Sequence, residues 1–287
     1  MAKTLLGLVG SPRKFGNSEL FIKELYLQLP GNWELKLIRL PDMDIRPCKA
    51  CYQCLFGEEK CPQDDDFALV LETLSQSDAY VVAAPTYLLG ANASLKRFLD
   101  RGLSFYAHID RLWGKPAVGV AIAGIDGMEG YTKLNVESFI KLTMGDLRGS
   151  AVVYGALPGE IFLRKEGQET ARRLAAALHD GQERVLPLAP ACPICGGDTF
   201  RFLPEGQVRC MLCSSSGAYV WQEGRLQMKT QPGQHSFFLG YEDAKRHADW
   251  LREMKDQFLK RRPELKTVAS GYTKLGNWVT PQGQDRG

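Results

Sequence analysis

The sequence has no long hydrophobic run and no excess of charge of one sign. Its most apolar stretch, Ala79 to Ala91, is interrupted by Pro85 and falls short of the about 18 apolar residues that a membrane helix needs. The 36 lysines and arginines nearly balance the 33 aspartates and glutamates, so charge gives no case for a nucleic-acid or membrane-surface partner. With 44% hydrophobic and 24% charged residues, disordered, collagen-like and low-complexity classes are excluded.

The first residues also lack the features of a secretory signal. The apolar run from Leu5 to Val9 is too short for the hydrophobic part of a signal, and a polar loop follows it. We therefore expect a cytoplasmic protein, in which thiols stay reduced. Eight cysteines are present, and none lies between Cys61 and Cys192. Because clustered reduced cysteines more often bind metal than stand idle, we expect two metal sites.

Apolar runs alternate with helical patterns over the first part of the chain, 1–181. Strands are predicted at 3–10, 34–40, 78–84, 115–123 and 149–154, and helices at 18–29, 64–76, 94–103, 129–144 and 166–179. This alternation predicts an α/β domain with a five-stranded, doubly wound parallel sheet. Short strands and turns predict a small module at 182–230. A helix over 241–262 and a loose polar tail from Pro263 complete the last part, 231–287.

The loop between the first strand and the first helix carries a set of anion-binding groups. Ser11, Arg13, Asn17 and Ser18 supply hydroxyls, a cation and an amide beside the N–H groups that open a helix, a combination that suits a phosphate monoester. A simple helix cap would also explain the asparagine and serines. The loop is neither a dinucleotide glycine motif nor a Walker loop.

Two later loops fall at the same edge of the predicted sheet, where ligands bind in such folds. The first, after the third strand, contains Pro85, Thr86 and Tyr87, and the second is the glycine-rich segment 124–130 after the fourth strand. Its glycines would let the backbone approach a planar ring closely. Each loop alone would be an ordinary connection, but three at one edge predict a binding site.

These motifs together resemble the flavodoxin-like NAD(P)H-dependent FMN reductases. The inserted segment CKACYQC, followed by a fourth cysteine, resembles the iron–sulfur flavoproteins, which carry FMN and a [4Fe–4S] cluster. The resemblance covers about residues 3–180. It implies that the first loop holds the FMN phosphate and that the other two surround the flavin ring; the residues so assigned are Ser11, Arg13, Asn17, Ser18, Pro85, Thr86, Tyr87, Gly124, Asp126 and Gly127. Thr86 departs from the family, in which a hydrophobic residue such as valine is expected.

The first cysteine group lies on the segment 47–62, and its members are Cys48, Cys51, Cys54 and Cys61. Cysteines spaced by two residues are typical of [4Fe–4S] sites. Zinc is the alternative, although its ligands usually come as two separated pairs.

The second cysteine group is made of two C-x2-C pairs, Cys192 with Cys195 and Cys210 with Cys213. This spacing predicts a zinc ribbon. Rubredoxin-type iron is the alternative, but the gap between the pairs is shorter than in rubredoxins. A closed zinc site would only hold the small module together.

The resemblance implies an electron-transfer oxidoreductase in which FMN handles two electrons and the cluster one. We expect no catalytic acid, base or nucleophile from the protein. NAD(P)H and ferredoxin are both candidate donors, and family membership implies a homo-oligomer, a dimer or tetramer. Two alternatives remain: an NAD(P)H-dependent FMN or quinone reductase without a cluster, and a redox-sensing binding module that presents the zinc ribbon to a partner.

Overall fold

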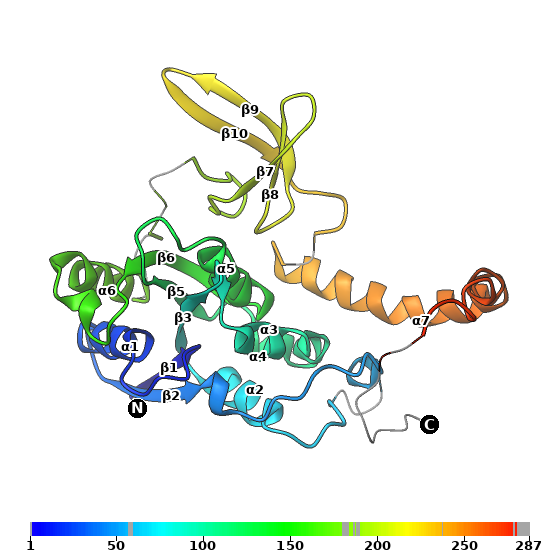
Figure 1. The fold of residues 1–287 in the computed structure, drawn as a ribbon, viewed down its shortest axis with the longest axis horizontal. Coiled ribbons are helices and arrows are strands. Elements are labelled where there is room, and N and C mark those ends of the chain that lie inside the picture. The colour runs from blue at the N-terminus through cyan, green and yellow to red at the C-terminus, as the bar shows by residue number, and fades with distance from the viewer. Residues whose placement is uncertain are drawn as a thin grey trace.

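The computed structural model describes residues 2–56, 60–179, 184–185, 187, 190–236, 238–277 and 279. Its first part is the predicted flavodoxin-like α/β domain, with five parallel strands in the order β2-β1-β3-β5-β6 (Figure 1). These strands are β1 (Lys3–Val9), β2 (Trp33–Arg39), β3 (Ala79–Tyr87), β5 (Pro116–Ala123) and β6 (Asp146–Tyr154). The two-residue strand β4 (Gly90–Ala91), which pairs antiparallel with β3, was not predicted.

Helices cover both faces of the sheet. One face packs against α1 (Asn17–Leu27) and α6 (Lys165–Ala177). The other packs against α2 (Phe67–Gln76), α3 (Ala93–Leu99), α4 (Ile109–Leu112) and α5 (Thr132–Leu142), with the 3-10 helix η3 (Gly102–His108) between α3 and α4. Further 3-10 turns are η1 (Leu40–Asp42), η2 (Gln53–Leu55) and η4 (Glu160–Phe162).

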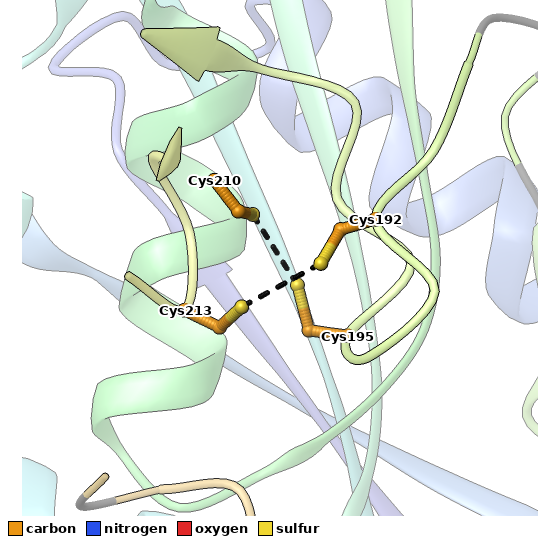
Figure 2. Close-up of side chains that lie close together, drawn as sticks. All are labelled: Cys192, Cys195, Cys210 and Cys213. Carbon is orange, nitrogen blue, oxygen red and sulfur yellow. Dashed lines mark hydrogen bonds between the residues drawn. The ribbon is translucent and has the colours of Figure 1, made fainter. Parts of the chain in front are cut away.

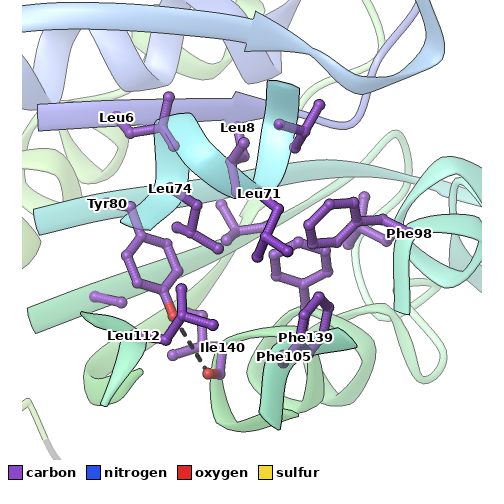
Figure 3. Close-up of a cluster of buried hydrophobic side chains, with 14 of the residues drawn as sticks. Leu6, Leu8, Leu71, Leu74, Tyr80, Phe98, Phe105, Leu112, Phe139 and Ile140 are labelled. Atoms are coloured by element: carbon purple, nitrogen blue, oxygen red, sulfur yellow. Dashed lines mark hydrogen bonds between the residues drawn. The ribbon is translucent and has the colours of Figure 1, made fainter. Parts of the chain in front are cut away.

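Strand alternation divides the core into two layers. In β1, Leu6 and Leu8 face one layer and Leu5 and Val9 the other, as successive side chains of a strand must. The first layer is rich in aromatic rings, and Figure 3 shows Phe98 packed with neighbouring rings beneath α2. The inner strands β1, β3 and β5 are buried on both faces, which explains why they read as continuous apolar runs, whereas the edge strand β2 alternates.

A small antiparallel sheet forms the C-terminal module. Its order is β10-β9-β8-β7, and its strands are β7 (Phe200–Leu203), β8 (Gln207–Cys210), β9 (Ser216–Gln222) and β10 (Arg225–Gln231). Glu223 and Gly224 both have positive φ, as a two-residue hairpin turn of this kind requires. The module is attached to α5 through Lys133, whose Nζ lies 2.6 Å from an Asp198 carboxylate oxygen. The domain boundary predicted at 181–182 lies outside the described residues.

The last helix, α7 (Tyr241–Ser270), is longer than predicted. It packs on the main domain through Ala244 and Ala248 and then projects away from it (Figure 1). The expected end at Pro263 is wrong: the helix continues to Ser270, because an exposed helix can leave the Leu259 carbonyl, which loses its N–H partner at the proline, to water. Among the described residues, no helix is long and apolar enough to span a bilayer.

Candidate functional site

Loops from four parallel strands enclose a cavity of about 220 Å³ at the carboxyl edge of the sheet. They follow β1, β3, β5 and β6, whose carboxyl ends all lie at this edge because the strands are parallel. The predicted cofactor residues that line the cavity are Ser11, Arg13, Asn17, Ser18, Pro85, Thr86, Tyr87 and Gly124. The structure thus gathers three loops that are far apart in sequence.

Two predicted residues lie outside this cavity. Asp126 and Gly127 belong to the same loop as Gly124 but are not among the lining residues. Gly127 has a φ of 78°, a left-handed turn that glycine adopts without strain. The Asp126 carboxylate lies 3.7 Å from the Arg164 guanidinium, and both side chains are exposed. Their assignment to the flavin therefore has no support in this geometry.

The amino end of α1 forms one wall of the cavity. The helix begins at Asn17, and its N-cap, Gly16, provides no side-chain hydrogen bond. The first-turn N–H groups of a helix point out of its amino end and attract anions. Ser11 and Ser18 are both buried beside them. This wall has the composition of a phosphate site, as the sequence predicted.

An ion pair that the sequence did not reveal braces the loop. Arg39, at the end of β2, donates hydrogen bonds to the carbonyl oxygens of Ser11 and Arg13 and to the Glu19 carboxylate at 2.6 Å. Burial would raise the pKa of Glu19, but hydrogen bonds from Lys23 and Arg39 lower it to about 2. Glu19 therefore stays ionised and holds Arg39 against the backbone of the loop.

Asn17 has a more specific position than predicted. Its amide nitrogen donates to the Gly155 carbonyl at 2.9 Å, and its amide oxygen accepts the Gly159 N–H at 2.7 Å. Asn17 therefore joins the loop after β1 to the loop after β6 across the cavity. Because both amide groups bind backbone, its main contribution here is to fix the shape of the phosphate wall.

The chemistry of the cavity fits a flavin mononucleotide. Thr86 Oγ1 is buried in the lining and has no hydrogen-bond partner among the described residues. A buried hydroxyl without a partner is unfavourable unless a ligand satisfies it. Tyr87, next in the chain, is about half exposed at 46%, which leaves an aromatic face available beside the cavity. The Thr86 hydroxyl thus offers a hydrogen bond to a bound group.

The first cysteine group occupies the loop between β2 and α2. Cys48 and Cys51 are exposed, whereas Cys54 and Cys61 are partly buried. Ala50 and Tyr52 have φ values of 50° and 60°, a left-handed conformation that non-glycine residues adopt at a cost and that is concentrated at functional sites. The strained backbone therefore indicates a functional role for this loop.

The four sulfurs of this first group do not meet at one point. In the described part of the chain, the second group is the one set of three or more metal-ligand side chains close enough to hold a single ion. A single zinc needs all four sulfurs at about 2.3 Å, whereas each thiolate of an iron–sulfur cubane binds its own iron. In the described residues the first group is thus not already arranged around a single ion, as the second group is.

The second cysteine group converges as a single-ion site requires. Cys192, Cys195, Cys210 and Cys213 are buried, and their sulfurs lie within 4.8 Å of one another. The Cys192–Cys213 and Cys195–Cys210 sulfurs are 3.7 and 3.6 Å apart (Figure 2). A tetrahedron with metal–sulfur bonds of about 2.3 Å has edges of about 3.8 Å. The four thiols are therefore already placed for a tetrahedral metal ion.

The two pairs of this second group have matching backbones. The Cys192 carbonyl accepts the Gly196 N–H, and the Cys210 carbonyl accepts the Ser214 N–H, at 2.8 and 2.9 Å. Gly196 and Ser214 both have positive φ, so each pair ends in the same left-handed turn. The cysteines also form most of the buried core of the module, together with Leu212. A metal at this point would replace the hydrophobic core that so small a module cannot build.

Comparison with known proteins identifies the family of this chain. Residues 4–156 match the family described as NADPH-dependent FMN reductase. An iron–sulfur flavoprotein of Archaeoglobus fulgidus is 28% identical over 65% of this chain and 83% of its own. A second, from Methanocaldococcus jannaschii, is 30% identical over 59% of this chain and 92% of its own.

A solved flavone reductase is similar in fold over nearly the whole chain. Its TM-score is 0.71 at 16% identity, with 97% of this chain and 100% of the other covered. At that identity the likeness concerns the fold alone. Because it extends over 97% of the chain, it includes the C-terminal module and α7 as well as the α/β domain.

Several lining residues were missed from the sequence. Ile122, Gly155, Ala156 and Pro158 complete the cavity, and the last three follow β6, a segment without charged or hydroxyl groups that could have drawn attention. The position of that segment after the fifth strand was the available signal, since this loop also ends at the carboxyl edge.

Proposed function

We propose that this chain, which belongs to the NADPH-dependent FMN reductase family and to the iron–sulfur flavoproteins, binds FMN in the carboxyl-edge cavity and exchanges electrons between it and an iron–sulfur centre on the loop 47–62. The flavin-dependent oxidoreductase activity follows from the family. The coupling to a one-electron centre is the proposal. The observation that carries FMN binding is the cavity, whose lining includes an uncapped helix end, two buried serines and an unsatisfied threonine hydroxyl. The coupling is supported by the cysteine spacing on the loop 47–62 and by the match to iron–sulfur flavoproteins.

In this proposal the protein supplies position rather than proton transfer. Ser11, Ser18 and the N–H groups of α1 hold the phosphate, and Arg13 neutralises it. Thr86 donates its free hydroxyl to the flavin ring, which Tyr87 flanks. Bound FMN would accept two electrons together and release them singly. NADPH is favoured as donor by the family description, and reduced ferredoxin is the competing donor.

The metal ions would differ between the two cysteine groups. Four sulfurs at Cys48, Cys51, Cys54 and Cys61 would hold the [4Fe–4S] cluster, since their spacing is typical of such sites and their sulfurs do not meet at one ion. The closed, buried tetrahedron of the second group would hold zinc, which has no redox chemistry and needs no open position. Rubredoxin-type iron would fit the same tetrahedron, so metal analysis must decide.

Apolar side chains beside the cavity support a homo-oligomer. Tyr87 ends β3, Leu88 and Leu89 follow it, and the three are exposed at 46%, 99% and 45%. Leu88 and Leu89 also have positive φ, a strained backbone conformation that is concentrated at functional sites. A second copy covering these side chains would close the cavity from water. Light scattering on the purified protein tests this, and a monomer at micromolar concentration would contradict it.

The composition of anaerobically purified protein tests the proposed cofactors. We expect one FMN, about four irons with matching sulfide, and one zinc per chain. One FMN with no iron and two zincs would support the cluster-free reductase instead. Iron without sulfide would indicate a rubredoxin-type site in the second group.

The Asn17→Ala variant tests the FMN site itself. It should bind FMN at least tenfold more weakly, because the loop after β1 loses its hydrogen bonds to the loop after β6. The Glu24→Gln variant, elsewhere on α1, is the matched control.

A further inference from the structure

Arg101 is an unusually buried cation next to the first cysteine group. The residue lies between α3 and η3 and is 2% exposed. Its guanidinium carbon lies 4.5 Å from the centre of the Phe67 ring, which supplies a cation–π contact. Arginine is rarely buried to this extent unless it is paired. Because burial removes water from the guanidinium, hydrogen bonds and an opposite charge from neighbouring groups must offset that loss.

Asp65 provides the opposite charge and accepts two of the hydrogen bonds of Arg101. Arg101 Nη1 and Nη2 donate to its two carboxylate oxygens at 2.6 and 3.3 Å, and both side chains are almost fully buried. Asp65 also accepts the backbone N–H groups of Arg46 and Phe67. The carboxylate thereby ties together both ends of the cysteine loop, since Arg46 precedes it and Phe67 follows it.

One donor of Arg101 is directed to a cysteine instead. Nη2 lies 2.9 Å from Cys61 Sγ, in hydrogen-bond contact. The 3-10 helix η3, which follows Arg101, packs against η2, which carries Cys54. The buried Ser104 hydroxyl of η3 has no hydrogen-bond partner among the described residues. The segment that begins at Arg101 therefore lies beside both inner cysteines of the group.

We propose that Arg101 is a positioning residue of the metal–thiolate centre, which orients Cys61 and makes the centre easier to reduce. The inference rests on the proposed iron–sulfur function. Hydrogen bonds to cluster sulfurs and nearby charge set reduction potentials. Reduction adds one electron and therefore one negative charge, and a cation in a poorly solvated position stabilises that charge more than an exposed one would.

The test is a reductive titration of the FMN- and iron-loaded protein with dithionite, followed by EPR. Dithionite supplies the electron that the cluster takes up, and no bond is made or broken in the protein. In Arg101→Gln we expect the ratio of reduced to oxidised cluster at a fixed potential to fall about tenfold, a midpoint about 59 mV more negative. Arg101→Lys keeps the charge and should stay near wild type.

A matched control separates local from general charge effects. Arg111→Gln removes the same charge from a partly exposed arginine that pairs with Glu72 on α2, and it should leave the midpoint unchanged. Equal midpoints for Arg101→Gln and wild type, or equal shifts for the glutamine and lysine variants, would overturn the proposal.

A second variant covers the case in which Arg101→Gln holds no iron. Asp65→Asn keeps the cation and removes its counter-charge, so the midpoint should become more positive; an unchanged midpoint would refute the role of charge. Wild-type protein without iron or sulfide would instead refute the proposed function, before any variant is compared. The two failures are therefore distinguishable.

Discussion

The brace between Glu19 and Arg39 offers a quantitative test of how the phosphate wall is held. Replacing Glu19 with glutamine keeps the size of the side chain and removes its charge. The carboxylate then no longer accepts charge-assisted hydrogen bonds from Lys23 and Arg39, or the N–H of Phe15. Arg39 loses one of its two ionic partners, while its pairing with Asp42 and its bonds to the loop carbonyls remain.

The expected loss follows from the pKa of Glu19. Its displacement from 4.5 to about 2 is worth about 3 kcal/mol of folding free energy at neutral pH, since each pKa unit is about 1.4 kcal/mol. A lowered carboxyl pKa stabilises the folded state above the pKa of the unfolded chain, and that contribution is lost as pH falls toward the folded value. The difference between wild type and Glu19→Gln should be full at pH 7 and shrink between about pH 4.5 and pH 2, to less than half at pH 3.

Urea unfolding at pH 7 and at pH 3 measures this difference. Glu24→Gln serves as the control, because Glu24 lies on the same helix, is only partly buried, and its side chain bonds only to Gln28 among the contacts described; its effect should stay within about 0.5 kcal/mol. FMN affinity of Glu19→Gln should also fall, since the loop is less firmly held. A destabilisation that is equal at the two pH values would show that the charge of Glu19 is not what matters.

Three further substitutions have definite expected outcomes. Cys195→Ser should abolish zinc binding and make the C-terminal module sensitive to protease while the α/β domain stays folded; retained zinc would contradict a four-cysteine site. Tyr80→Phe removes a buried hydroxyl that donates to the Ile140 carbonyl at 3.2 Å and should cost about 1 kcal/mol in urea unfolding, with no change in FMN binding. Gly130→Ala would place a methyl group 2.2 Å from the Leu89 carbonyl oxygen at a φ of +54°, so the loops after β3 and β5 must separate and FMN affinity should fall; an unchanged affinity would show that these loops are not coupled.

The sequence predicted the parallel sheet because each inner strand is a buried apolar run. It failed where an element is short or is decided by its surroundings. β4 has two residues and no periodicity, so nothing in Gly90–Ala91 distinguishes it from a turn. α7 passes Pro263 because its far half is exposed and clashes with nothing, whereas the same proline inside a packed helix would end it.

The candidate site was predictable for residues whose chemistry is unusual in a connecting loop. Ser11 and Ser18 could be selected because their hydroxyls stand in the loop between a predicted strand and a predicted helix, at the edge where ligands bind. Thr86 was assigned only through the family resemblance. The ion pairs could not be predicted. Glu19 and Arg39, or Asp65 and Arg101, are 20 and 36 residues apart, and their pairing depends on how helices and loops pack.

The two cysteine groups show how local backbone decides what the same ligand can bind. In the second group, each pair ends in a left-handed turn at its own Gly196 or Ser214, and the antiparallel strand β8 brings one pair against the other. The four sulfurs then surround one point. In the first group, left-handed residues lie between the cysteines, at Ala50 and Tyr52, and the four thiols do not form a single-ion group in the described structure. A single ion would have to draw that loop together against the Arg101–Asp65 pair, whereas a larger cluster could bind each thiolate close to where it lies. Because the ligand atoms are identical, we expect loop conformation to decide which metal each group prefers.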